Sequence, residues 1–200
     1  MFTGIFDPAF LQSAGNVNGD APENNIIRLH IFQQVYSFEP TVSCIGDISV
    51  DYVKGGQHII LHYSDLVNSE IVEDIPDEDT DVIITGKVTK LVMSGPPYAC
   101  INSVDVSECK TLVDLTASFG NLATLNLNTQ LTNIVLTNSH DLEAIYYAAV
   151  NSAVSTAIAN AITNADSNSG IVYTNSGAAY YDTIAQAATA KGWTIQQLLY

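Results

Sequence analysis

The pattern of apolar and polar positions is most regular between Val88 and Tyr147. One motif recurs there: an apolar residue, two intervening residues, a second apolar residue, one intervening residue and a third apolar residue. Its instances begin at Val88, Ile101, Leu112, Leu122, Leu131 and Leu142. Alternate instances, at 101, 122 and 142, are about twenty residues apart. Such a period is typical of a solenoid, in which each coil buries its apolar edge only against its neighbours.

Apolar runs before this region predict β-structure. We expect strands over 26–32, 42–45, 48–53, 58–63 and 82–86. Lys54-Gly55-Gly56 separates two of these strands and predicts a tight hairpin, because paired glycines readily adopt the positive φ angles of such turns.

The period changes after the repeats. Apolar residues then recur every four positions, which predicts an amphipathic, alanine-rich helix over 148–165. We expect short strands at 171–173 and 193–195, on either side of a second helix at 178–190 that ends at Gly192. A solenoid needs an atypical closing unit, and this α/β segment would supply it.

The segment from Ile101 to Leu112 is similar to the L-x-x-L-D-V-S-x-N/C-x-x-L unit of leucine-rich repeats common in Bacteroides-like bacteria and their phages. Leu122 to Leu127 keeps the pattern with Asn for Asp, and 142–147 keeps its strand portion. Residues 190–195 resemble the C-terminal cap of the same family. The resemblance implies a solenoid whose strands line a surface available for binding.

A second resemblance lies upstream. Asp47 to Tyr52, the Gly-Gly turn, His58 to Tyr63 and 82–86 resemble a PKD-type immunoglobulin-like sandwich. Tyr52 stands where that family has Trp, and Val53-Lys54-Gly55-Gly56 departs from its turn motif.

These patterns together predict an α+β fold, with an N-terminal β-sandwich-like domain followed by a short leucine-rich-repeat solenoid and an α/β C-terminal cap. The expected divisions are an N-terminal arm at 1–25, an immunoglobulin/PKD-like β domain at 26–87, leucine-rich repeats at 88–147 and the α/β cap at 148–200.

Composition narrows the function. The 200 residues are 47% hydrophobic, which argues against disorder. Asp and Glu number 21 against 6 Lys and Arg, for a net charge of −15, so we expect neither nucleic acid nor an anionic membrane surface as partner. No apolar run is long enough to predict membrane insertion.

Cys44, Cys100 and Cys109 lack metal-binding spacing and are expected in the core.

Chemical motifs are weak. His58 and His62 have a zinc-like spacing, but on a strand their Cα atoms lie about 13 Å apart, too far to share an ion. Asp77-x-Asp79-x-Asp81 resembles the start of an EF-hand loop, although Val82 replaces the required glycine. The acidic stretch 70–81 is either a solvated loop or a weak calcium site. Nucleophile and phosphate-loop motifs are absent, so we expect no enzyme and no cofactor.

Two groups of residues are candidates for binding. Asp105, Asn126 and Tyr146 lie between the last two apolar positions of their repeats and should face away from the core. The second group consists of three apolar residues of the N-terminal arm, Phe2, Phe6 and Phe10. The arm is either a docking peptide that orders on a partner or a strap packed on the chain's own core.

The expected function is a non-enzymatic structural or protein-interaction protein. Met1 without an export signal favours a phage virion component, such as a head fibre, decoration or tail-associated protein, assembled in the host cytoplasm. A fragment of a bacterial cell-surface adhesin is the alternative, and a calcium-binding or catalytic module using 70–81 is the alternative of another class. The expected partners are capsid or other virion proteins, a host surface protein or glycan, or further copies of this chain.

Overall fold

The computed structural model describes residues 25–33, 38–71 and 76–198. The strands are β1 (Ile26–Ile31), β2 (Thr41–Lys54), β3 (Gln57–Ser64), β4 (Ser69–Glu70), β5 (Thr80–Ser94), β6 (Ile101–Asp105), β7 (Asp114–Ser118), β8 (Thr124–Asn126), β9 (Asn133–Val135), β10 (Ala144–Tyr146), β11 (Ile171–Thr174) and β12 (Thr194–Gln197). The helices are α1 (Ser152–Asn164) and α2 (Tyr181–Lys191), with a 3-10 helix at Pro96–Cys100. The fold is therefore mostly β with two helices, consistent with the α+β class.

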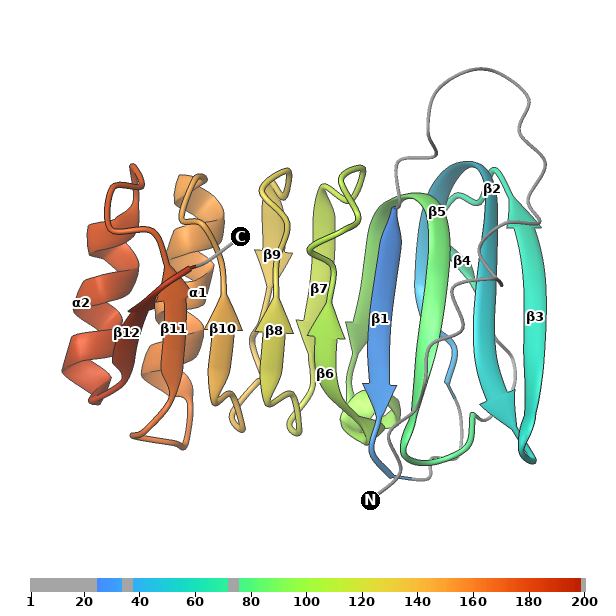
Figure 1. The fold of residues 1–200 in the computed structure, drawn as a ribbon, viewed down its shortest axis with the longest axis horizontal. Coiled ribbons are helices and arrows are strands. Elements are labelled where there is room, and N and C mark those ends of the chain that lie inside the picture. The colour runs from blue at the N-terminus through green and yellow to red at the C-terminus, as the bar shows by residue number, and fades with distance from the viewer. Residues whose placement is uncertain (1–24, 34–37, 72–75, 199–200) are drawn as a thin grey trace.

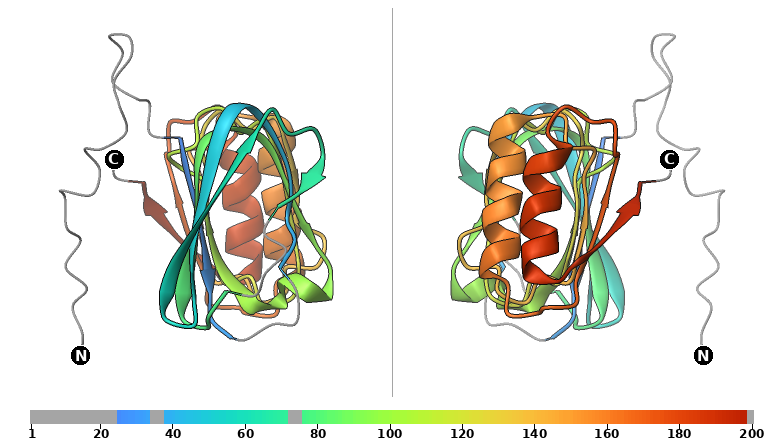
Figure 2. Two further views of the ribbon diagram at one scale, coloured as in Figure 1. Left: turned by 90° about the vertical axis from the view of Figure 1, so that its right-hand side faces the viewer. Right: turned by 90° about the vertical axis from the view of Figure 1, so that its left-hand side faces the viewer.

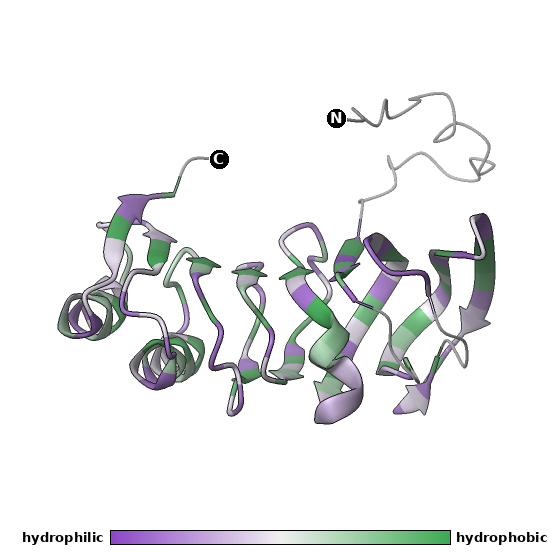
Figure 3. Ribbon diagram, turned by 90° about the horizontal axis from the view of Figure 1, so that it is seen from below, coloured by the Kyte–Doolittle hydropathy of each residue, from purple (hydrophilic) through white to green (hydrophobic). Residues whose placement is uncertain are grey.

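One mixed sheet runs through the molecule in the order β12-β11-β10-β8-β6-β1-β5-β2-β3 (Figure 1). The strand β7 branches from β5 and is followed by β9, while β4 pairs with β2. Seen from the ends, the chain forms two facing layers (Figure 2). We call the layer that contains β1, β6, β8, β10, β11 and β12 the front layer. The back layer contains β7, β9, α1 and α2 (Figure 3).

The front layer contains a parallel stretch whose inward-facing residues are aligned. Val104, Leu125, Ile145, Val172 and Ile195 are successive partners along β6, β8, β10, β11 and β12. Between these strands the chain crosses to the back layer as β7, β9, α1 and α2 in turn. Successive apolar motifs therefore lie in opposite layers and alternate motifs in the same layer, which explains why the period is seen between every second instance.

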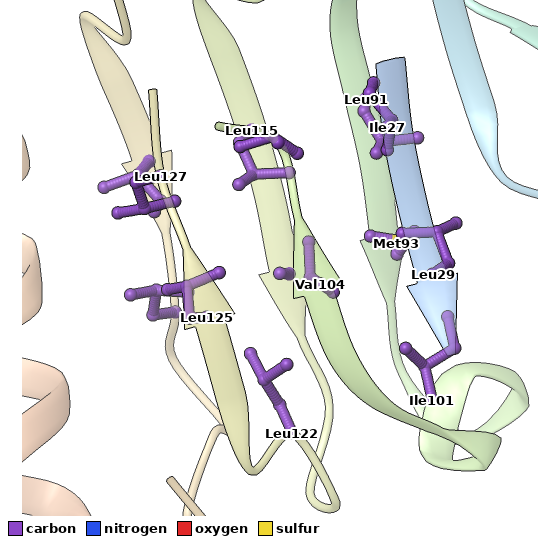
Figure 4. Close-up of a cluster of buried hydrophobic side chains, with 14 of the residues drawn as sticks. Ile27, Leu29, Leu91, Met93, Ile101, Val104, Leu115, Leu122, Leu125 and Leu127 are labelled. Carbon is purple, nitrogen blue, oxygen red and sulfur yellow. The ribbon is translucent and has the colours of Figure 1, made fainter. Parts of the chain in front are cut away.

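The interior between the layers is a single buried cluster. Leu115 of β7 is aligned with Leu91 of β5 and Ile134 of β9 in the back layer. Leu115, Leu125 and Ile145 all belong to this cluster. Figure 4 shows Leu115 and Leu125 within the same group of buried side chains. The layers thus seal one continuous core between them.

The long strands β2 and β5 connect the two layers. Residues 80–85 of β5 pair with β1, whereas residues 90–94 pair with β7. The β2 register shifts between Ile45 and Ile48, opposite Gly86, whose φ is +129°. Sequence reasoning predicted two strands here, but a bulge allows one strand to bend and continue. The expected division between residues 87 and 88 falls inside β5, and the core cluster includes residues from both sides.

Local sequence explains both helices. The Asn151 side chain accepts a hydrogen bond from the Val154 amide at 3.1 Å, so α1 begins at Ser152, four residues later than expected. Gly192 ends α2 with a φ of +83°, the expected left-handed C-cap. In the described ranges, neither helix is long and apolar enough to cross a membrane.

Candidate functional site

A row of side chains crosses the outer surface of the front layer. Its members are paired directly with one another across neighbouring strands; we call them the front row: Arg28, Asp105, Asn126, Tyr146, Tyr173 and Gln196. Each is half-buried except Gln196, which is exposed. They face outward because the preceding residue of each strand points into the core, and strand side chains alternate between faces. The front row therefore spans six adjacent strands as one continuous surface.

The aromatic part of the front row lies on β10 and β11. The rings of Tyr146 and Tyr173 stack with centroids 4.2 Å apart and planes inclined by 2°. Burial, followed by hydrogen bonding to Tyr173, raises the pKa of Tyr146, so this phenol is neutral at physiological pH. Stacked rings restrict each other's rotation, and tyrosines with few rotatable bonds bind partners at low entropic cost.

The polar part of the front row is held by local hydrogen bonds. The Asp105 carboxylate accepts hydrogen bonds from the Ser107 amide at 2.9 Å and the Ser107 hydroxyl at 2.7 Å. The Arg28 guanidinium lies 3.2 Å from the Glu108 carboxylate. These contacts fix the direction of the Asp105 and Arg28 side chains before any partner binds. The row thus changes from charged side chains at β1 to aromatic ones at β10 and β11.

The acidic stretch 70–81 is divided between separate contacts. The Asp77 carboxylate accepts hydrogen bonds from the amides of Gly55 and Gly56, each at 2.9 Å. Asp81 and Asp79 instead lie 2.8 and 3.6 Å from the imidazole of His30. Among the residues that the structure describes, which omit 72–75, no three His, Cys, Asp or Glu side chains are placed to hold a metal ion.

The thiols are buried. Burial raises the pKa of Cys100 to about 11 and also raises the pKa of Cys109. All three cysteines are free and lie in the interior.

A hollow of about 550 Å³ lies at the N-terminal ends of the front strands, beside Asn102, Asp141 and Asp166. Its lining residues include neither cysteine nor histidine.

The structure places the candidate residues as follows. Asp105, Asn126 and Tyr146 are direct lateral neighbours in the front layer. Thr116 and Val135, at the same motif position in the alternate repeats, pair with each other in the back layer. Phe2, Phe6 and Phe10 lie outside the described residues.

Arg28, Tyr173 and Gln196 also belong to the front row, and the repeat pattern did not reveal them. The α1 helix lengthens the coil before Tyr173, so the twenty-residue period no longer locates it. A sequence signal was present: Ile171-Val172-Tyr173 ends in a β-branched residue followed by tyrosine, as Ala144-Ile145-Tyr146 does.

Comparisons with protein-family models, with curated proteins and with solved structures found no match for this chain. The fold class and the front row therefore rest on the chain's own geometry.

Proposed function

We propose that this protein is a non-catalytic structural component that binds another protein through its front row. The observation that carries the proposal is the unbroken alignment of six outward side chains, with two stacked tyrosines among them. Tyrosine is enriched among the residues that dominate protein interfaces, and neighbouring polar groups supply orientation.

The proposal includes a finer description of the fold. The parallel part is a short solenoid of the leucine-rich-repeat type, and the antiparallel strands β1, β2, β3 and β5 form its N-terminal unit. Polar side chains that hydrogen-bond to carbonyls of the preceding coil support this description, in the pairs Thr111 to Val88, Asn121 to Ala99, Asn128 to Cys109 and Ser139 to Ala117. The immunoglobulin/PKD resemblance of 26–87 stays a prediction.

Asn128 gives the clearest support for stacked coils. Its buried side-chain amide donates to the carbonyls of Cys109 and Leu112, at 2.5 and 3.2 Å. Its carbonyl oxygen accepts from the amides of Gln130 and Leu131, at 2.8 and 2.9 Å. One side chain thereby satisfies the backbone of two successive coils, which makes the platform stiff.

The proposed setting is a phage particle, in which both the arm at 1–25 and the front row would contact other virion proteins. Net charge supports a partner surface that carries Lys and Arg, because 21 acidic residues against 6 basic ones steer such a surface toward this chain. An acidic surface also repels phosphate backbones, which favours a protein partner over nucleic acid.

The test is copurification with assembled particles. We expect the full chain to sediment with the particles, and expect the paired variant Tyr146→Ala with Tyr173→Ala to raise the dissociation constant at least tenfold, equivalent to about 1.4 kcal/mol. Thr116→Ala with Val135→Ala, on the back layer, is the matched control and should bind as the parent does. Equal binding by both variants would refute the front row as the contact surface, and absence from particles would refute the setting.

A further inference from the structure

The strand β3 forms one end of the sheet, and its outer edge has no strand partner among the described residues. It pairs with β2 from Lys54 opposite Gln57 to Asp47 opposite Ser64, without a register shift. Proteins usually protect a long, regular edge with lysine, proline or a bulge, because its free amides and carbonyls can pair with another strand. The segment Gln57–Ser64 contains none of these.

Hairpin geometry shows which backbone groups face the free edge. Gly55 and Gly56 form a two-residue loop with φ angles of +58° and +75°. Such a loop makes Lys54 and Gln57 a hydrogen-bonded pair, after which bonded and non-bonded pairs alternate. The amides and carbonyls of His58, Ile60 and His62 therefore point away from β2, toward the free edge.

The side chains of β3 suit association with an uncharged strand. Residues 57–64 contain no Asp, Glu, Lys or Arg, in a chain whose net charge is −15. Ile60 is 45% exposed on the outer surface. On the inner surface Ile59 and Leu61 are half-buried and pack against the core. Among the residues that the structure describes, the apolar interior therefore reaches this end of the sheet with its side chains still partly exposed.

The opposite end of the sheet differs. The strand β12 has four residues, Thr194–Gln197, and its Gln197 side chain donates a hydrogen bond to the Asn175 side chain at 2.8 Å. A β3 edge of eight residues does not match it in length or in apolar character. Pairing of β3 with β12 of another copy is therefore poorly supported. Pairing of β3 with β3 of another copy would join two strands of equal length, equal charge and the same pattern of side chains.

We propose that β3 pairs antiparallel with β3 of a second copy, giving a two-fold dimer with one continuous sheet. Centring the pair on Ile60 places His58 opposite His62 of the second copy, and each of these residues directs its free backbone groups to the other chain. The same alignment places Ile59 opposite Leu61 of the second copy, so the two cores meet. A two-fold contact is closed and stops at the dimer.

Sedimentation velocity of the full chain over increasing concentration tests this proposal. We expect a reversible monomer–dimer equilibrium. Ile60→Lys should weaken dimerisation at least tenfold, because the two-fold axis brings both lysines together without disturbing the core. Ile45→Lys is the matched control, since Ile45 is 62% exposed on β2 and lies away from the β3 edge. Circular dichroism should show both variants folded.

Amide hydrogen exchange on the unsubstituted chain gives a second, independent result. The amides of His58, Ile60 and His62 should become protected as concentration rises, while that of Ile59, already bonded to β2, should not change. A chain that stays monomeric, that forms larger assemblies, or whose dimer tolerates Ile60→Lys would overturn the proposal. None of these results depends on particle binding by the front row, so the two proposals can fail separately.

Discussion

At the residue scale, Asp77 holds the β2–β3 hairpin in place. Hydrogen bonds from the amides of Gly56 and Gly55 lower the pKa of the Asp77 carboxyl from its ordinary value of 3.8. The ionised form is thus favoured in the folded state. Its contribution to stability is fully present above the unfolded pKa and is lost as pH falls through the lower, folded pKa.

We therefore expect Asp77→Ala to lower the free energy of unfolding at neutral pH. The difference from the parent should shrink as pH falls through about 4 and below. Urea unfolding at a series of pH values measures it, with the exposed neighbour Glu78→Ala as control. A difference that is constant with pH would show that the carboxylate charge is not responsible.

The residues that form each strand could be predicted from the sequence more completely than the contacts between distant segments. The spacing of Leu125 and Ile145 predicted that they are adjacent, and their neighbours Asn126 and Tyr146 followed from strand alternation. The role of Asp77 could not be predicted in this way, because its partners lie more than twenty residues earlier in a different turn. The EF-hand-like spacing pointed to Asp77 as a calcium ligand, whereas its carboxylate accepts hydrogen bonds from the amides of Gly55 and Gly56.

At the element scale, the crossing of β2 and β5 between layers depends on Gly86. Its φ of +129° is disfavoured for residues with a side chain. A Cβ atom there would also lie 2.7 Å from the Asp47 carbonyl oxygen and 2.8 Å from the Ile48 side chain. The β2 bulge and the glycine of β5 are therefore two parts of one bend.

We expect Gly86→Ala to destabilise the fold by about 2–4 kcal/mol, the sum of backbone strain and a forced shift of β2. Gly56→Ala is the matched control, since Gly56 also has a positive φ but has open space around it. That variant should cost about 1 kcal/mol. Chemical denaturation of the two variants measures the difference, and equal losses would show that the close approach to Asp47 is unimportant.

The elements themselves were largely predictable, and their continuity was not. Gly46 and Asp47 interrupt the apolar run between Ile45 and Ile48, so a strand ending was the natural interpretation of the sequence. The structure keeps the strand and absorbs the interruption in a bulge, because β5 supplies a flexible residue directly opposite. Whether the strand continues depends on its pairing with β5, which lies about 40 residues later in the chain. The local sequence pattern around Gly46 contains no information about that pairing.

At the scale of the whole molecule, one buried cluster spans both layers, including the two helices. We therefore expect a single cooperative unfolding transition. The only tryptophan, Trp193, lies at the C-terminal end, so its fluorescence reports on that end alone. Its transition should coincide with that of far-ultraviolet circular dichroism, as two-state unfolding requires.

A substitution at the far end makes this expectation sharper. Ile84→Ala in β5 removes part of a fully buried side chain and should cost about 2–5 kcal/mol. In a cooperative molecule the Trp193 transition shifts by the same free energy. An unchanged Trp193 transition would instead favour two independent units, as the expected division at residues 87 and 88 implies.

The replacement of back strands by α1 and α2 has a geometric consequence. Strands in a sheet are spaced about 4.8 Å apart, whereas packed helices need about 8–10 Å. The back layer is therefore wider than the front layer where α1 and α2 follow β10 and β11. The front layer must bend there, so that its outer surface is concave. The stacked tyrosines lie at the start of this concave part, so a convex ligand would contact them first and a flat one would rest on the strands nearer β1.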